Sequence, residues 1–263
     1  MKKFVVTMLN ALGVFVALLL VWQGLVVLLH VPVYMLPTPV AVGRAVVARF
    51  PSLMASLAIT SEEAAGGLAA SIVVGMMVAL LFAQSRWIRR MFYPYTILLQ
   101  TVPIVAIAPL ILMWVGPGLL SVMLVAFIIC LAPIIANTTQ GLISVEPNLI
   151  HLFLMHNASR VQLLTRLRLP HAVPSLFVGI RIAAGISVIG AITGELFAGS
   201  ARVGEGGLGY SILYAMAQLQ TDYLFALVLA ATVLGFAFFF VVMFLEWHFL
   251  HNWHDSARTI TDE

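Results

Sequence analysis

Long apolar runs alternate with short polar interruptions along the chain, and this pattern predicts a bundle of membrane-spanning helices. A helix needs about 20 consecutive apolar residues to cross a bilayer. Six runs reach or approach that length, so we expect an all-α, polytopic membrane protein with about six transmembrane helices. The predicted spans are residues 4–29, 53–82, 93–114, 119–139, 175–197 and 224–247. The first run is longer than the apolar core of a signal peptide, which favours a retained helix.

The longest polar interruption, residues 146–170, predicts two short helices joined by a sharp turn. Pro147 suits the first position of a helix, where its missing N–H is not needed. Asn157 tolerates the left-handed conformation that ends a helix. Ser159, with Gln162 three residues later, has the signature of a capping box at the start of the second helix. An interfacial helix lying against lipid headgroups is the alternative for this segment.

Prolines mark the expected ends and bends of several helices. We expect the second hairpin helix to stop at Leu169-Pro170, because the residue before a proline avoids the helical conformation. Pro103 and Pro109 should bend the third span and Pro133 should break the fourth, since each removes a backbone hydrogen bond. Membrane helices tolerate such bends where they line a cavity or pack on protein.

Composition fits a membrane protein and narrows the function classes. The chain is 62% hydrophobic and 9% charged, whereas a soluble domain has about 25% charged residues. The net charge of +3 does not indicate nucleic-acid binding, since the basic residues are spread between apolar runs. Cys130 is the single cysteine and cannot form a disulfide within the chain. The sequence has no P-loop, so ATP chemistry would come from another chain, and no side chains form a catalytic constellation.

Three histidines near the end of the chain, His248, His251 and His254, recur every third residue. This spacing places them near one helix face, as a metal site would require. Trp247 and Trp253 accompany them, and aromatic residues gather where a membrane helix leaves the bilayer. We therefore interpret the group as an interfacial anchor and expect no metal.

The distribution of Lys and Arg predicts the orientation, because cytoplasmic loops carry an excess of these residues. One side collects nine of them and the other three. The nine are Lys2, Lys3, Arg86, Arg89, Arg90, Arg160, Arg166, Arg168 and Arg258; the three are Arg44, Arg49 and Arg202. We expect both termini and the hairpin to be cytoplasmic. One transmembrane domain should then comprise a first helix and non-cytoplasmic loop (1–50), a core with the hairpin (51–248) and a cytoplasmic tail (249–263).

The hairpin ends in Leu167-Arg168-Leu169-Pro170, with Asn157 ten positions before Leu167 and His151 six positions before Asn157. This resembles the cytoplasmic motif of the permease subunits of binding-protein-dependent ATP-binding-cassette importers. That motif is EAA, three residues, G, nine residues and I-x-L-P. The proline end matches, whereas His151 and Asn157 depart from the Glu and Gly of the motif.

Further segments extend the resemblance from about Leu36 to His248. They are Leu36–Pro39, Thr60-x-x-Glu63 with Gly67, Gln100–Pro103, Ala108–Leu110, Trp114-x-Gly116 and Gly207–Tyr210. In this order they are most similar to the permeases for nitrate, sulfonates and taurine and to those for thiamine pyrimidines and riboflavin. The resemblance implies a type I importer-like permease in a bacterial inner membrane, translocating a small organic nutrient or anion.

The resemblance also implies partners and site residues. The permease would pair with a second permease subunit, in a homodimer, and with two ATPase subunits and an extracytoplasmic binding protein. ATP and magnesium would be bound by the ATPase subunits, and this chain would hold no cofactor. The residues expected to couple to the ATPase are Leu149, Phe153, Leu154, Asn157, Ala158, Ser159, Leu169 and Pro170.

Polar residues within the spans are the material for a translocation pathway. The candidates are Glu63, Gln100, Thr101, Pro103 and Glu195. Each could instead satisfy helix backbone or a neighbouring helix. An ion-gradient-driven transporter or channel is the alternative function, and it would use Glu62, Glu63 and Glu195 as coupling acids.

Overall fold

Helices make up nearly all of the described chain. The computed structural model describes residues 2–198 and 206–251, with the backbone alone for residues 2–9, 11 and 12. No strand occurs in these ranges. The elements are α1 (Lys2–Leu28), α2 (Pro39–Ala48), α3 (Phe50–Gln84), α4 (Arg86–Thr101), α5 (Ile104–Val115), α6 (Leu119–Ile143), α7 (Pro147–Met155), α8 (Arg160–Leu163), the π-helical turn η1 (Leu164–Arg168), α9 (Leu169–Ala198), α10 (Leu208–Ala217) and α11 (Thr221–Leu250).

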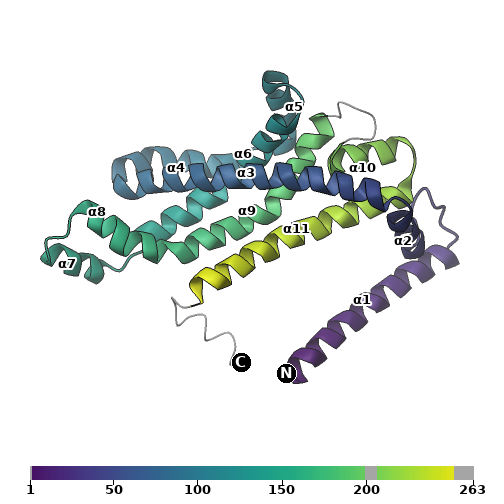
Figure 1. The fold of residues 1–263 in the computed structure, drawn as a ribbon, viewed down its shortest axis with the longest axis horizontal. Coiled ribbons are helices and arrows are strands. Elements are labelled where there is room, and N and C mark those ends of the chain that lie inside the picture. The colour runs from purple at the N-terminus through teal and green to yellow at the C-terminus, as the bar shows by residue number, and fades with distance from the viewer. Residues whose placement is uncertain (1, 199–205, 252–263) are drawn as a thin grey trace.

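The helices form an elongated bundle whose two ends carry different elements (Figure 1). The hairpin of α7 and α8 projects from one end, here called the hairpin end. Helices α2 and α10 lie at the opposite end, here called the α10 end. Helices α6 and α9 make the most extensive contact; α3 packs against both of them, and α11 packs against α9. Helix α1 runs apart from the bundle, with α2 as its main helix contact.

Small residues allow the central helices to approach closely. A Cβ atom at Gly67 of α3 would lie 2.7 Å from the backbone oxygen of Met123 on α6. One at Gly190 of α9 would lie 2.8 Å from the Cα atom of Ala126, also on α6. Without a strong hydrophobic drive between helices in lipid, close van der Waals packing of this kind stabilises their association.

The all-α polytopic fold is confirmed. Four segments of the described chain are long and apolar enough to cross a membrane: α3, α6, the segment Arg160–Ala198 and α11. A fifth is possible if α4 and α5 form one broken span. The remaining predicted span corresponds to α1, whose fully described part, Gly13–Leu28, is shorter than the spanning length.

The third predicted span is more strongly broken than a kinked helix. Helices α4 and α5 meet at 99°. Val102, the C-cap of α4, and Pro103, the N-cap of α5, both have extended backbones, as expected where a residue precedes a proline. Pro109 lies inside α5, which continues past it to Val115.

Two other predictions about prolines were wrong. Pro133 lies inside α6, which continues to Ile143, and Asn137 Nδ2 donates a hydrogen bond of 2.8 Å to its carbonyl oxygen. Pro170 does not end the second hairpin helix, because Leu169 stays helical and α9 begins there. The π turn η1 provides the reason: the Leu169 N–H donates to the Leu164 oxygen five residues back, and a widened turn accommodates the proline ring.

Some predictions lie outside the described residues. They concern Arg202, Trp253, His254 and Arg258, together with most of the tail that begins at residue 249. The side chains of Lys2 and Lys3 are likewise outside the description.

Candidate functional site

The first helix of the hairpin ends in a Schellman motif. Asn157 has a φ of 54°, which confirms the left-handed conformation predicted for it. Its N–H donates to the Leu154 oxygen at 3.0 Å, and the Ala158 N–H donates to the Phe153 oxygen at 3.0 Å. These two bonds satisfy carbonyl groups that the end of a helix leaves free. Asn therefore replaces the usual glycine at this position without loss of the turn.

The second helix of the hairpin begins with the predicted capping box. The Gln162 N–H donates to Ser159 Oγ at 3.2 Å, and the Ser159 N–H donates to Gln162 Oε1 at 2.8 Å. Each bond satisfies a donor at the start of α8. The turn between α7 and α8 is thus fixed on both sides by local hydrogen bonds.

The second arm of the hairpin is continuous with a membrane helix. α8, η1 and α9 together form one helical segment, Arg160–Ala198, of 39 residues. Arg168 Nη1 donates to the Ala83 oxygen at the end of α3 at 3.0 Å. Leu164 and Leu169 pack against the buried cluster of Ala79, Ala83, Leu142 and Ala172. A displacement of the hairpin would therefore act directly on α9.

The first arm presents an exposed apolar face. Leu149, Leu152 and Leu154 are exposed, and Met155 is 80% exposed. Beside this face, between the arms, lies a hollow of about 270 Å³. Its lining residues are Leu152, Phe153, His156, Ala158, Gln162 and Arg166. Phe153 and Ala158 were expected at a docking site, whereas Leu152, His156, Gln162 and Arg166 were not assigned to it.

The two acidic candidates, Glu63 of α3 and Glu195 of α9, come together at the α10 end. They are 5% and 3% exposed, and their carboxyl groups lie close to each other. The sequence placed them in two different spans and gave no sign of this contact.

Glu195 also holds the start of α10. It accepts hydrogen bonds from Thr60 Oγ1 at 2.6 Å and from the Gly209 N–H. The Leu208 N–H donates to Thr60 Oγ1 at 2.8 Å. The first N–H groups of a helix lack partners within the helix, and here α3 and α9 supply them. The glycine-rich segment before α10 allows this close approach, because a Cβ atom at Gly207 would overlap the Glu195 carboxyl group.

Gln100, Thr101 and Pro103 lie at the break between α4 and α5. A cavity of about 410 Å³ adjoins this break. Its lining residues are Leu99, Gln100, Val102, Ile104, Ile128, Ile129, Pro133, Asn137, Ile182 and Ile186. Gln100 is therefore a lining residue. Thr101 and Pro103 are not among them, and the Thr101 hydroxyl donates to the Leu98 oxygen at 2.8 Å.

The cavity at the break is apolar with two amide side chains, Gln100 and Asn137, and no charged residue among those that line it. Asn137 was not among the pathway candidates selected from the sequence. Its position four residues after Pro133 is the signal that could have identified it. The NH₂ group of Asn137 donates to the Pro133 oxygen within α6, and its carbonyl oxygen stays available for another partner.

Comparison with known proteins connects this geometry to a family. The sequence model described as "binding-protein-dependent transport system inner membrane component" matches residues 71–250. A probable ABC transporter permease protein of Haemophilus influenzae is 32% identical over 89% of this chain and 93% of its own length.

Two further relatives have more specific names. The formylaminopyrimidine transport permease protein of Halalkalibacterium halodurans is 32% identical over 88% of this chain and 91% of its own. The riboflavin transport system permease protein of Chloroflexus aurantiacus is 36% identical over 75% of each. A chain from the inward-facing methionine ABC transporter has a similar fold, with a TM-score of 0.53 and 21% identity over 74% of this chain and 94% of that one.

Proposed function

Because this chain belongs to the family of binding-protein-dependent transport system inner membrane components, as an ABC importer permease, we propose that it forms the translocation pathway of an ATP-driven importer. Two copies of the chain would enclose the pathway. Two ATPase subunits would bind at the hairpin end, and an extracytoplasmic binding protein would deliver the substrate at the α10 end.

The α7–α8 hairpin is the observation that carries this proposal. Its turn is fixed by the Schellman motif at Asn157 and the capping box at Ser159. Its apolar side chains are nevertheless exposed, and α7 contains no buried residue. A rigid helical element with an exposed apolar face suits recognition by a groove in a partner protein. A gradient-driven transporter has no need of such an element.

The continuity from α8 to α9 supports a mechanism for coupling. A partner that closes around the hairpin would move the whole segment Arg160–Ala198, and α9 makes the most extensive contact in the bundle, with α6. The partner must bind the two conformations with different affinity, since equal affinity would shift nothing. Orientation rests on the charge distribution, which supports cytoplasmic placement of the hairpin and of both termini.

The uncharged cavity at the break between α4 and α5 supports a neutral, heteroaromatic substrate. Its amides Gln100 and Asn137 can donate to and accept from a pyrimidine or flavin ring, while its apolar walls cover the ring faces. A sulfonate or nitrate would favour a cationic or N–H-rich site. The names of the relatives from Halalkalibacterium and Chloroflexus agree with this choice.

A purification experiment tests the coupling role. The chain is purified in detergent from cells that contain its partners, as wild type and as the hairpin variant L149D/F153D/L154D. Co-purifying ATP hydrolysis should fall at least about tenfold in the hairpin variant, because the buried apolar anchors of an interface carry most of its affinity. In lipid discs with the binding protein, wild-type ATP hydrolysis should respond to formylaminopyrimidine or riboflavin rather than to taurine.

The matched control places the same kind of change at the other end. Met216 and Leu219 are exposed at the end of α10, so M216D/L219D should keep the ATPase and weaken capture of the binding protein. Equal loss of the ATPase in both variants would contradict a specific role for the hairpin. An intact wild-type dimer that brings down no ATPase would contradict the importer proposal itself.

A further inference from the structure

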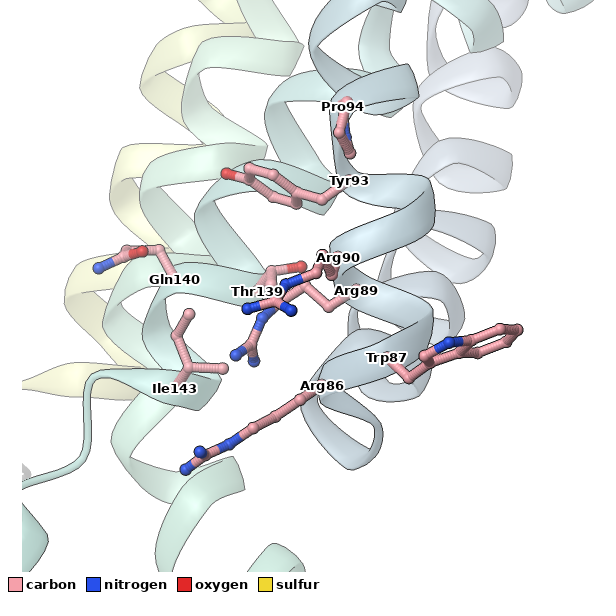
Figure 2. A pocket seen from close by; sticks show the side chains of 9 residues that line it. All are labelled: Arg86, Trp87, Arg89, Arg90, Tyr93, Pro94, Thr139, Gln140 and Ile143. Atoms are coloured by element: carbon pink, nitrogen blue, oxygen red, sulfur yellow. The ribbon is translucent and has the colours of Figure 1, made fainter.

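Three arginines at the hairpin end face one pocket between α4 and α6 (Figure 2). Arg86, Arg89 and Arg90 lie in the first turns of α4, and the pocket beside them measures about 800 Å³. Figure 2 shows their guanidinium groups directed toward α6, where Thr139 forms part of the wall. Trp87 points to the opposite side of the helix.

The positive charge of this pocket has no protein counter-charge within the described residues. The ion pair found in those ranges joins Arg181 to Glu246 at 3.1 Å, and neither residue lines the pocket. The hydrogen bond found for these three arginines is long: Arg89 Nη1 donates to the Phe82 oxygen at 3.5 Å. Like charges that face one pocket repel one another, so an anion bound among the three arginines would be favoured.

A second, independent feature indicates a ligand. Thr139 is 1% exposed, lines the pocket, and its Oγ1 atom has no hydrogen-bond partner within the described residues. Buried hydroxyl groups in proteins nearly always have a partner. Figure 2 shows the Thr139 oxygen directed toward the side of α4 that carries Arg90 and Tyr93. An anionic oxygen in the pocket could accept from this hydroxyl and from the arginines together.

The surroundings of the pocket favour a lipid as the source of that anion. Trp87 is 68% exposed beside the arginines, and Met91, Phe92, Tyr95 and Leu98 continue an exposed apolar face along α4. Trp commonly marks the level of the lipid headgroups. Basic pockets between membrane helices are suited to phosphate headgroups of anionic lipids. We propose that the pocket between α4 and α6 binds the phosphate headgroup of an anionic membrane lipid.

This site would stabilise the broken helix pair. Arg86, Arg89 and Arg90 belong to α4, whose far end forms the break at Val102 and Pro103. A headgroup bound between α4 and α6 would hold the first of these helices against the core without contacting the cavity at the break. The inference is independent of which substrate the protein carries and of the ATPase partner.

Native mass spectrometry tests the proposal. The protein is purified in detergent, as dimer or monomer, and titrated with phosphatidylglycerol or with phosphatidylcholine. The wild type should retain phosphatidylglycerol preferentially. R86Q/R89Q/R90Q should bind it about a hundredfold more weakly, since each arginine near a lipid surface contributes a severalfold factor. Thr139→Val keeps the arginines and should weaken binding about fivefold, as expected for one lost hydrogen bond.

Two controls and a soluble ligand make the test specific. Arg44→Gln, on α2, and Arg160→Gln, on α8, remove exposed arginines outside the pocket and should leave the lipid preference unchanged. Glycerol 3-phosphate added with phosphatidylcholine to the protein in detergent should not reproduce the effect of phosphatidylglycerol. The proposal is overturned if the triple variant, shown to be monodisperse, keeps its preference, if the controls lose it equally, or if the soluble phosphate binds as well as the lipid.

Discussion

The two ends of the bundle differ in how their polar groups are satisfied. At the α10 end, Glu63, Glu195 and Thr60 are buried, and Glu195 and Thr60 bind the first N–H groups of α10. At the hairpin end, the hydrogen bonds of α7 and α8 are mainly local, and the arginines at the start of α4 are partly or fully exposed. The polar groups of the α10 end are paired by contacts between distant parts of the chain, whereas those of the hairpin end are accessible to other molecules.

This difference separates residues that stabilise the fold from residues available for partners. A buried acid that accepts two donors cannot be removed without leaving those donors unpaired. An exposed leucine or arginine can be removed at little cost to the fold, because it makes few internal contacts. We therefore expect substitutions of the buried polar residues at the α10 end to lower stability, and substitutions of exposed residues at the hairpin end to change binding with stability nearly constant.

Removing Glu195 should have the largest effect on stability. In Glu195→Ala the Gly209 N–H loses its acceptor and buried Glu63 loses its neighbour, while the Thr60 hydroxyl is left with the Ser56 oxygen at 3.1 Å. The free energy of unfolding should fall by about 3 kcal/mol, since each buried unpaired polar group costs about 1–3 kcal/mol. For a chain of this size this corresponds to a fall of about 6–12 °C in melting temperature, measured by thermal unfolding in detergent.

Glu62→Ala is the matched control for that measurement. Glu62 is next to Glu63 in the sequence but exposed, so its removal should change the free energy of unfolding by less than about 0.5 kcal/mol. If both variants melt at the wild-type temperature, the contact between α3, α9 and α10 does not stabilise the fold and the comparison of the two ends fails.

A methyl group at Gly209 should have the next largest effect. A Cβ atom there would overlap the Ile192 backbone oxygen and lie 2.8 Å from the Glu195 Cβ atom. Gly209→Ala should therefore cost about 1–3 kcal/mol, as overpacking does in other cores. In contrast, Gly235→Ala on α11 meets no atom within 4 Å and should be neutral or slightly stabilising, because Ala favours helix. Equal melting temperatures for the two variants would show that α10 can shift on α9 to make room for the methyl group.

The sequence predicted those parts of the fold that depend on local pattern. Apolar runs gave the helices because each span must satisfy its backbone internally. The turn at Asn157 and the capping box at Ser159 and Gln162 were confirmed, since such motifs involve neighbouring residues only. The effect of two prolines was predicted wrongly. Pro133 and Pro170 remain inside helical segments, the second directly after a π turn, and neither outcome follows from the proline alone.

The arrangement of the candidate sites depended on contacts between distant residues. Glu63 and Glu195 were both selected as polar residues of spans, but their proximity and the bond from α10 to Glu195 follow from the packing of three helices. Arg86, Arg89 and Arg90 were used only to assign orientation. Their common pocket with Thr139 appears once α4 lies against α6. In both cases the residue types were visible in the sequence, whereas their partners were not.

The smallest effect on global stability is expected at the turn of the hairpin. Asn157 has a φ of 54°, where a β-branched residue is strained by about 1–2 kcal/mol. Asn157→Val should destabilise this turn locally. Hydrogen exchange of the Asn157 and Ala158 amides, which close the turn, should accelerate roughly tenfold, while the melting temperature stays near that of wild type. Asn157→Gly should preserve the protection, because glycine adopts this conformation readily. A large fall in melting temperature for Asn157→Val would instead mean that the hairpin unfolds together with the core, so that both ends form one cooperative unit.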